Sequence, residues 1–275
     1  MSQLDSGTFQ QVKDLVLSGY HLNDIPGLAC PTALLPQNTS IESLERFAYE
    51  RFRFRGAMDT TSIDDFVRYS VGYAEEEEKA RCFIDADNML ARSIFNIGTL
   101  HNPGHADNVA SIKLKKTAPF RALLAINGDH LNQKQIAEWL EDWSDYLTAF
   151  DADGQTMKIA QAAQAVRRVT IQQTNAADHE DGDFSGKKSL MQSIEASSKD
   201  VMPVAFEFKC VPYEGLAERA FSLRNSLLKS SDPVFVLRIV QLEAQEEAIA
   251  NEFRDLLVGK FDGKPVETFI GNFKA

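Results

Sequence analysis

Cysteine is scarce in this sequence of 275 residues, and its pattern excludes two kinds of structural support. The three cysteines are Cys30, Cys82 and Cys210, and they contain no C-x-x-C pair. Structural zinc sites and disulfide frameworks use closely spaced or numerous cysteines. We therefore expect reduced thiols, with one reactive thiol as the alternative, in a chain long enough to bury its own core.

Long hydrophobic runs are also missing. Nowhere do about 18 apolar residues follow one another, which is the length from which a membrane-spanning helix is read. The first 18 residues are polar with helical periodicity, unlike the basic and then apolar pattern of a signal peptide. We expect a cytoplasmic protein with no membrane association.

Positive charge is low relative to negative charge. The chain has 29 lysines and arginines against 40 aspartates and glutamates, for a net charge of −11. Binding to phosphates depends on lysine and arginine displacing counterions. This balance excludes a protein that coats DNA through general basic charge, and it leaves local basic patches open.

Common catalytic motifs are absent from the sequence. It contains no G-x-x-x-x-G-K-[ST], no G-x-G-x-x-G and no G-x-S-x-G. No nucleophile is paired with a base in a recognisable pattern. We therefore expect a protein that is not an enzyme and holds no cofactor.

Periodicity and punctuation predict the secondary structure. Helices are predicted at 8–18, 41–49, 62–73, 119–126, 133–150, 156–169 and 242–258, the last closed by Gly259. Strands are predicted at 51–56, 80–85, 89–98, 109–115, 204–210, 221–227, 233–240 and 266–273. The last four strands are expected to form one sheet, and the helix at 242–258 is expected to pack on one face of it. The fold class predicted is α+β, with antiparallel or mixed sheets and helices packed on one face.

The chain divides by composition into three regions. Residues 1–154 form an N-terminal α+β region, residues 155–200 a helix followed by a polar loop or arm, and residues 201–275 a C-terminal β-β-β-α-β region. The polar stretch at 173–200 is poor in large apolar residues, which favours an exposed segment. One continuous domain is the alternative.

The stretch HNPGHAD at 101–107 raises the question of a metal site. His101, His105 and Asp107 offer three ligands from one loop, and zinc needs three or four that converge. The Pro-Gly pair forces a turn between the histidines, so they are not an i, i+4 pair on a helix. We expect a polar loop between strands, with the metal site as the alternative.

Two further groups of charged residues suggest binding sites. Arg51, Arg53 and Arg55 alternate with phenylalanine, and would form a basic surface for nucleic acid together with Lys113, Lys115 and Lys116 if both strands share a sheet face. We expect an amphipathic strand whose arginines pair with acids, and the basic surface for nucleic acid is the alternative. Asp85 and Asp87 are expected to be turn residues.

Acidic residues line one side of the predicted helix at 133–150. They are Glu138, Glu141, Asp142 and Asp145. We expect a solvated face. The alternative is that this charge lets the protein imitate DNA and occupy a host nuclease. Trp139 and Trp143 lie on the opposite side, and we expect them to pack against the core.

One long stretch resembles a known family. The residues CFIDADNMLARSIFNIGTLHNPGHADNVASIKLKKTAPFRALLAINGDHLNQKQIAEWLEDW at 82–143 are similar to the signature region of the YfdQ-like proteins of phages and prophages. The runs FKCVPYEGLAERAFSLR at 208–224 and VLRIVQLEAQEEAIANEFRDLL at 236–257 fit the same family. The resemblance implies a phage or prophage accessory protein in the bacterial cytoplasm, and it transfers no catalytic residue.

Self-association is the leading functional hypothesis. The strands RFRFRG at 51–56 and VETFIGNF at 266–273 are candidates for exposed sheet edges, which invite pairing with another copy. The polar arm at 173–200 would order against a neighbouring subunit. The expected partner is a second copy of the chain, and the alternatives are a monomer, a nucleic-acid handling accessory, or an inhibitor bound to a host or phage protein.

Overall fold

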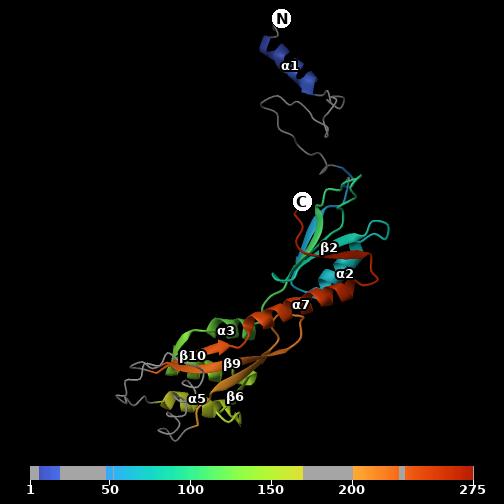
Figure 1. Ribbon diagram of the computed structural model, residues 1–275. Coiled ribbons are helices and arrows are strands. Elements are labelled where there is room, and N and C mark those ends of the chain that lie inside the picture. The colour runs from blue at the N-terminus through green and yellow to red at the C-terminus, as the bar shows by residue number, and fades with distance from the viewer. Residues whose placement is uncertain (1–5, 19–47, 52, 170–200, 229–232, 275) are drawn as a thin grey trace. The chain divides into compact units, whose positions relative to one another are not determined.

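The computed structural model describes residues 6–18, 48–51, 53–169, 201–228 and 233–274 (Figure 1). The chain divides into two compact units, residues 1–54 and residues 55–275. In the first unit, helix α1 (Ser6–Ser18) confirms the helix predicted at 8–18. The predictions for 173–200 and for most of 41–49 lie outside the described residues.

A mixed five-stranded sheet forms one part of the second unit. Its strands are β1 (Gly56–Thr60), β2 (Ala80–Asp85), β3 (Leu90–Ile94), β4 (Asn108–Lys113) and β11 (Val266–Ile270). They lie in the order β1-β4-β3-β2-β11. The three central strands are antiparallel, while β1 runs parallel to β4 and β11 runs parallel to β2.

The hairpin of β2 and β3 follows from local turn chemistry. Met89 adopts a φ of 53° and its amide donates to the Ala86 carbonyl at 3.0 Å. The Asp85 carboxylate accepts hydrogen bonds of 3.0 and 2.9 Å from Nδ2 of Asn88. Short polar side chains favour such turns because they bond to their neighbours. The predicted hairpin is confirmed, with Asp87 in its turn, whereas Asp85 ends β2 opposite Leu90.

Helices α2 (Ile63–Tyr73) and α7 (Leu242–Phe261) pack on one face of the five-stranded sheet. The Ser62 hydroxyl caps α2 by accepting from the Asp65 amide at 3.2 Å, and the Ser62 amide donates to Oγ1 of Thr60 at 3.0 Å. Phe66 of α2 meets Phe261 of α7 edge to face, with ring centroids 6.0 Å apart. The alternating residues of the strands supply the other side of this core, as Cys82 and Ile112 illustrate with no exposed area.

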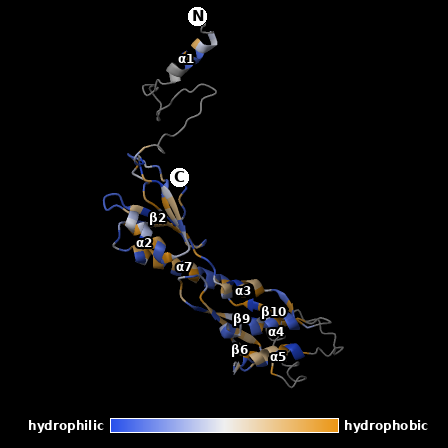
Figure 2. Cartoon of the chain, turned by 180° about the vertical axis from the view of Figure 1, so that it is seen from behind, coloured by the Kyte–Doolittle hydropathy of each residue, from blue (hydrophilic) through white to orange (hydrophobic). Residues whose placement is uncertain are grey.

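An antiparallel six-stranded sheet forms the other part of this unit. Its strands are β5 (His130–Asn132), β6 (Leu147–Phe150), β7 (Thr156–Met157), β8 (Ala205–Cys210), β9 (Arg219–Leu228) and β10 (Val234–Ile239), in the order β5-β10-β9-β8-β6-β7. Helices α3 (Ala118–Ile126), α4 (Gln133–Asp142) and α5 (Ile159–Arg168) contact it. The hydropathy of each element can be followed in Figure 2. The α+β class with helices on one face of each sheet is confirmed.

The predicted strand at 51–56 is wrong. Of the described residues in this range only Gly56 belongs to a strand, and β1 continues from it to Thr60. The partner strand explains the shift, because β4 begins at Asn108, which lies opposite Gly56. The alternating arginines and phenylalanines therefore lie just before the strand and not within it.

The predicted helix at 133–150 is correct only up to Asp142. Asn132 caps α4 with the predicted geometry, and its side chain accepts from the Gln135 amide at 2.9 Å. A 3-10 turn at Ser144–Tyr146 then leads into β6, whose Leu147 lies opposite Phe208 of β8. Pairing with β8 outweighs helical periodicity, which is a weak local preference.

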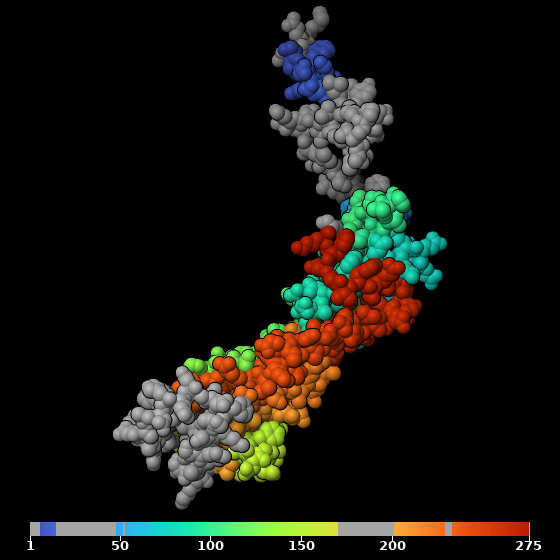
Figure 3. Space-filling view, viewed as in Figure 1, coloured from blue at the N-terminus to red at the C-terminus, as the bar shows by residue number. Residues whose placement is uncertain are grey.

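The end of the chain also departs from expectation. Helix α7 continues past Gly259 to Phe261, because Phe261 is buried with 2% of its area exposed and the space around Gly259 is open. The last strand, β11, joins β2 and not the sheet of β8, β9 and β10. In the space-filling view of Figure 3 the red C-terminal residues lie against cyan and green atoms. No helix among the described residues is long and apolar enough to cross a membrane.

Candidate functional site

The segment between β3 and β4, which contains HNPGHAD, forms a tightly closed loop. Gly98 and Pro103 make an isolated antiparallel bridge, and the Gly104 amide donates to the Ile97 carbonyl at 3.0 Å. A Cβ atom on Gly104 would lie 2.1 Å from the Asn96 carbonyl oxygen. The predicted polar loop between strands is confirmed.

Of the possible metal ligands of this loop, Asp107 is hydrogen-bonded within the loop, whereas the two histidines are exposed. Asp107 accepts a hydrogen bond of 2.8 Å from Nδ2 of Asn96, whose Oδ1 accepts from the Asn108 amide at 3.0 Å. These bonds close the base of the loop, and His101 and His105 are exposed. Within the described part of the chain, no three His, Cys, Asp or Glu side chains are grouped to hold a metal ion.

The basic residues singled out in the sequence lie in two places. They are Arg51, Arg53 and Arg55, before β1, and Lys113, Lys115 and Lys116, at and after the end of β4. Because β1 and β4 run in parallel with Gly56 opposite Asn108, Arg55 and Lys113 lie at opposite ends of β4. At about 3.3 Å per residue the two are separated by roughly 20 Å along the strand. Arg55 and Lys113 therefore do not lie side by side in the sheet, whereas Arg51 and Arg53 belong to the first unit.

The acidic face of α4 is partly neutralised. Arg167 donates to both carboxylate oxygens of Glu141, at 2.5 and 2.8 Å, and Lys134 lies 3.7 Å from Glu138. Asp142 and Asp145 are exposed. Neutralised carboxylates resemble a phosphate row less closely, so this geometry does not favour the hypothesis of DNA imitation.

The two tryptophans pack against the core as predicted. Trp139 stacks on Phe208 with ring centroids 5.8 Å apart, and Tyr146 stacks on the same ring at 5.6 Å. Phe208 itself has no exposed area. This cluster stabilises the junction of α4 and β8.

The described cysteines are buried. Burial raises the pKa of the Cys82 thiol to about 12, although a hydrogen bond with Ser93 opposes the shift. Burial likewise raises the pKa of Cys210 to about 12, with Glu218 adding to it. Both remain protonated at neutral pH, and reactivity needs the thiolate. Cys30 lies outside the described residues.

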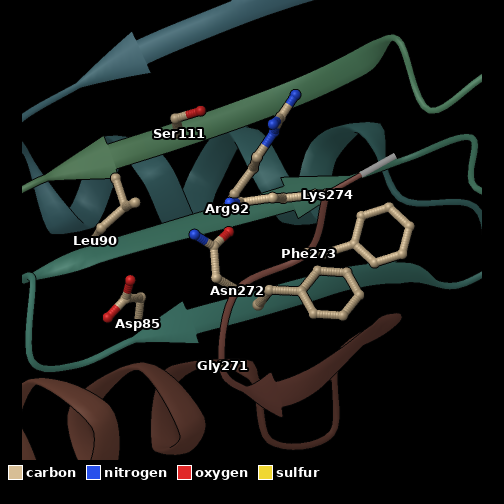
Figure 4. A pocket seen from close by; sticks show the side chains of 9 residues that line it. Asp85, Leu90, Arg92, Ser111, Gly271, Asn272, Phe273 and Lys274 are labelled. Carbon is tan, nitrogen blue, oxygen red and sulfur yellow. The ribbon is translucent and has the colours of Figure 1, made fainter.

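A hollow of about 520 Å³ lies on the face of the five-stranded sheet opposite α2 and α7, which we call the open face (Figure 4). Its floor comes from Phe83, Asp85, Leu90, Arg92 and Ser111, on β2, β3 and β4. Its remaining wall is the segment Gly271–Lys274, which follows β11 and crosses the sheet. A φ of 131° at Gly271 and a 2.8 Å bond from its amide to the Ile84 carbonyl direct the chain over this face.

Three phenylalanines stand side by side on the open face and form what we call the phenylalanine ladder. Phe83 lies directly opposite Phe269 in the register of β2 and β11, and their rings stack with centroids 5.3 Å apart. On its other contact, Phe83 stacks with Phe273 at 4.9 Å. Phe269 is 43% exposed. An apolar row on the outer face of a sheet is a departure from the usual polar outer face.

Cationic side chains flank the phenylalanine ladder. Arg92 lies directly opposite Phe83, and Lys113 lies opposite Leu90, one diagonal position from Arg92. Lys274 lies on the wall of the hollow. Among the described residues, none of these three forms a salt bridge. By contrast, Nε of Arg81, two residues before Phe83 on β2, lies 4.0 Å from Oε2 of Glu267. The open face offers stacking surfaces and positive charge. Among the described residues that line it, no nucleophilic side chain is paired with a general base.

Sequence reasoning did not find this site. The alternation in ARCFID predicts that Phe83 points away from Cys82, and nothing local indicates a second ring beside it. Phe269 and Phe273 reach Phe83 only because β11 pairs with β2 across most of the chain. Of the residues singled out in the sequence, Asp85 and Lys113 lie on the open face.

Comparison with known proteins gives one match. The family model described as an uncharacterized conserved protein, DUF2303, matches residues 21–273. No curated protein and no solved structure matches the chain.

Proposed function

The chain belongs to the DUF2303 family of uncharacterized conserved proteins, and from that premise we propose that it is a non-enzymatic accessory protein that self-associates into homo-oligomers. The similarity of residues 82–143 to YfdQ-like proteins supports a role in phages or prophages. The absence of common catalytic motifs from the sequence supports a role other than catalysis.

The observation that carries self-association is the outer edge of β11. Within the described strands, β2 is the sole partner of β11, so its second edge ends the sheet. The Pro265 carbonyl accepts from Ala80 at 3.1 Å, and the Gly271 amide donates to Ile84 at 2.8 Å. Backbone groups alternate in direction along a strand, so Thr268 and Ile270 direct their amides and carbonyls away from β2. Such unpaired groups are a template for a further strand.

A second copy is the occupant that fits this edge. Two β11 strands related by a twofold axis would run antiparallel, with Thr268 opposite its counterpart and the two five-stranded sheets joined into one. Ile270 is 61% exposed and would gain cover from the paired strand. Covering an exposed apolar side chain adds to the stability of the backbone pairing.

Charge substitution at Thr268 tests this edge. Size-exclusion chromatography with light scattering should give a mass of at least twice 30.7 kDa for the unchanged protein. Thr268→Lys and Thr268→Asp should each be monomeric, because like charges would lie directly opposite across the twofold axis. An equimolar mixture of the two variants should restore the larger species. Thr268→Val, which keeps the strand and adds no charge, is the control and should leave the mass unchanged.

Two results would overturn the proposal. A single species of 30.7 kDa at every concentration would exclude stable self-association. An oligomer that persists in both charged variants would exclude β11 as its interface. Circular dichroism of each variant checks that the fold is retained. We expect it to be retained, because the exchanged side chain lies at the sheet edge.

A further inference from the structure

The phenylalanine ladder and its cations form a surface with a chemical logic separate from the edge of β11. We propose that the open face binds single-stranded nucleic acid, with a base stacked at the phenylalanine ladder and phosphates held by Arg92, Lys113 and Lys274. This site does not depend on self-association.

The first argument is the arrangement of the rings. The three rings form one stack, in which the centroid of Phe83 lies 5.3 Å from that of Phe269 and 4.9 Å from that of Phe273. A planar group placed against an end of this stack would extend it. Proteins that bind single strands use aromatic side chains on a sheet in this way, and every base has a face that can stack.

The second argument is charge. Arg92 is the cross-strand neighbour of Phe83, and its side chain extends from β3 toward β4 over the open face (Figure 4). This cation therefore lies on the same sheet face as the phenylalanine ladder. With Lys113 and Lys274 the open face has three cations that form no salt bridge with a described residue. Asp85 also lines the hollow, but its carboxylate accepts two bonds from the Asn88 amide group. Positive charge beside aromatic rings matches the two parts of a nucleotide.

The third argument concerns the size and the occupant. The hollow of about 520 Å³ lies within the usual range of roughly 300–1,000 Å³ for small-molecule sites. A second copy docked face to face would oppose the three cations to the same three cations, and like charges repel. Nucleic acid supplies the missing negative charge, and the stacked rings and three cations of the open face favour it as the occupant.

Fluorescence anisotropy with a labelled twenty-nucleotide thymidine strand tests the proposal on the full-length protein. Binding should appear at 50 mM salt. Three phosphate contacts should give a slope of about −2 for the logarithm of the association constant against the logarithm of salt. A uridine strand should bind with a similar slope, because stacking and phosphate contacts do not require a particular sugar.

Variants separate the two parts of the site. Arg92→Ala and Lys274→Ala should each reduce the slope by about 0.7. Phe273→Leu keeps an apolar side chain and removes the ring, so affinity should fall about tenfold. The matched control is Arg238→Ala, an exposed arginine on β10 of the other sheet, which should leave binding unchanged.

Three outcomes would overturn the proposal. One is no binding at 50 mM salt with 100 µM protein. Another is binding that Arg92→Ala and Lys274→Ala leave unchanged. The third is a monomer that appears on Phe273→Leu or Arg92→Ala substitution, which would assign the open face to contact between copies. The Thr268→Lys variant should still bind the thymidine strand. Failure of the proposed self-association through β11 is therefore distinguishable from failure of nucleic-acid binding.

Discussion

Arg219 on β9 and Glu252 on α7 form an ion pair that joins the six-stranded sheet to the helix packed on the other sheet. Nη2 of Arg219 donates to Oε2 of Glu252 at 2.8 Å and to the Ala248 carbonyl at 3.2 Å. Oε1 of Glu252 accepts from the Ala217 amide at 2.7 Å. The two side chains are 23% and 21% exposed. A single carboxylate therefore satisfies donors from both the strand and the loop before it.

Replacement of Glu252 by alanine should destabilise the protein by about 2 kcal/mol, between the values for exposed and buried ion pairs. The loss has two sources, since the Arg219 charge and the Ala217 amide both lose their acceptor. Urea unfolding followed by circular dichroism measures the change. Glu247→Ala, an exposed position on the same helix, should stay within about 0.5 kcal/mol of the unchanged protein. Equal stability of the two variants would contradict the role of the ion pair.

The contact of Phe261 with Phe66 predicts a larger effect. Phe261→Ala should cost about 3–4 kcal/mol, because it removes a buried ring and leaves a cavity between α2 and α7. Val258 is 40% exposed on the same turn of helix, and Val258→Ala should cost less than about 1 kcal/mol. Thermal or urea unfolding separates the two. If both variants lost the same stability, α7 would not pack through Phe261.

Two glycines should respond to alanine in opposite directions. Gly104→Ala should destabilise the β3–β4 loop by about 1–3 kcal/mol, because the new Cβ would lie 2.1 Å from the Asn96 carbonyl oxygen. Gly259→Ala should stabilise the protein by about 0.5–1 kcal/mol, since this glycine lies inside α7 with open space around it. Differential scanning calorimetry of the two variants checks both signs. A stabilising Gly104→Ala would show that the loop is not closed as described.

The buried thiols predict a loss of stability in alkaline solution. The pKa of Cys82 is raised to about 12 in the folded chain, above its ordinary value of 9.0. Folding is therefore favoured fully below that ordinary value, and the advantage declines as pH rises and the thiol of the unfolded chain ionises. Between pH 8 and pH 10 the contribution of Cys82 should fall by about 1.5 kcal/mol.

A cysteine variant isolates this effect. Urea unfolding of Cys82→Ala at pH 8, 9 and 10 should show a shallower decline than the unchanged protein. The comparison is needed because the raised pKa values of Tyr69 and Tyr213 act in the same direction. Identical pH dependence in the two proteins would mean that the Cys82 thiol is accessible to water.

Local structure followed from the sequence wherever local chemistry decides it. Ser62 and Asn132 each cap a helix through a side-chain oxygen, and a capping residue acts within three positions. The hairpin of β2 and β3 was equally readable. These features depend on neighbours in the chain, so a single sequence contains the information.

Sheet membership did not follow, because it depends on partners far along the chain. Residues 147–150 continue a helical pattern, yet Leu147 pairs with Phe208, sixty-one positions later. Hydrophobic periodicity records that one side of a segment is buried and does not record against what. The phenylalanine ladder was hidden for the same reason, since Phe83 and Phe269 become neighbours only through the pairing of β2 with β11.

The placement of β11 has a consequence for synthesis on the ribosome. Strand β2 is made early, but its outer neighbour is not translated until Val266–Ile270. The nascent chain must therefore carry an incomplete sheet with an open β2 flank while residues 86–265 emerge. Closure of so long a loop is slow relative to local pairing. We expect chaperone engagement to end, and protease resistance to begin, only after that final strand leaves the exit tunnel.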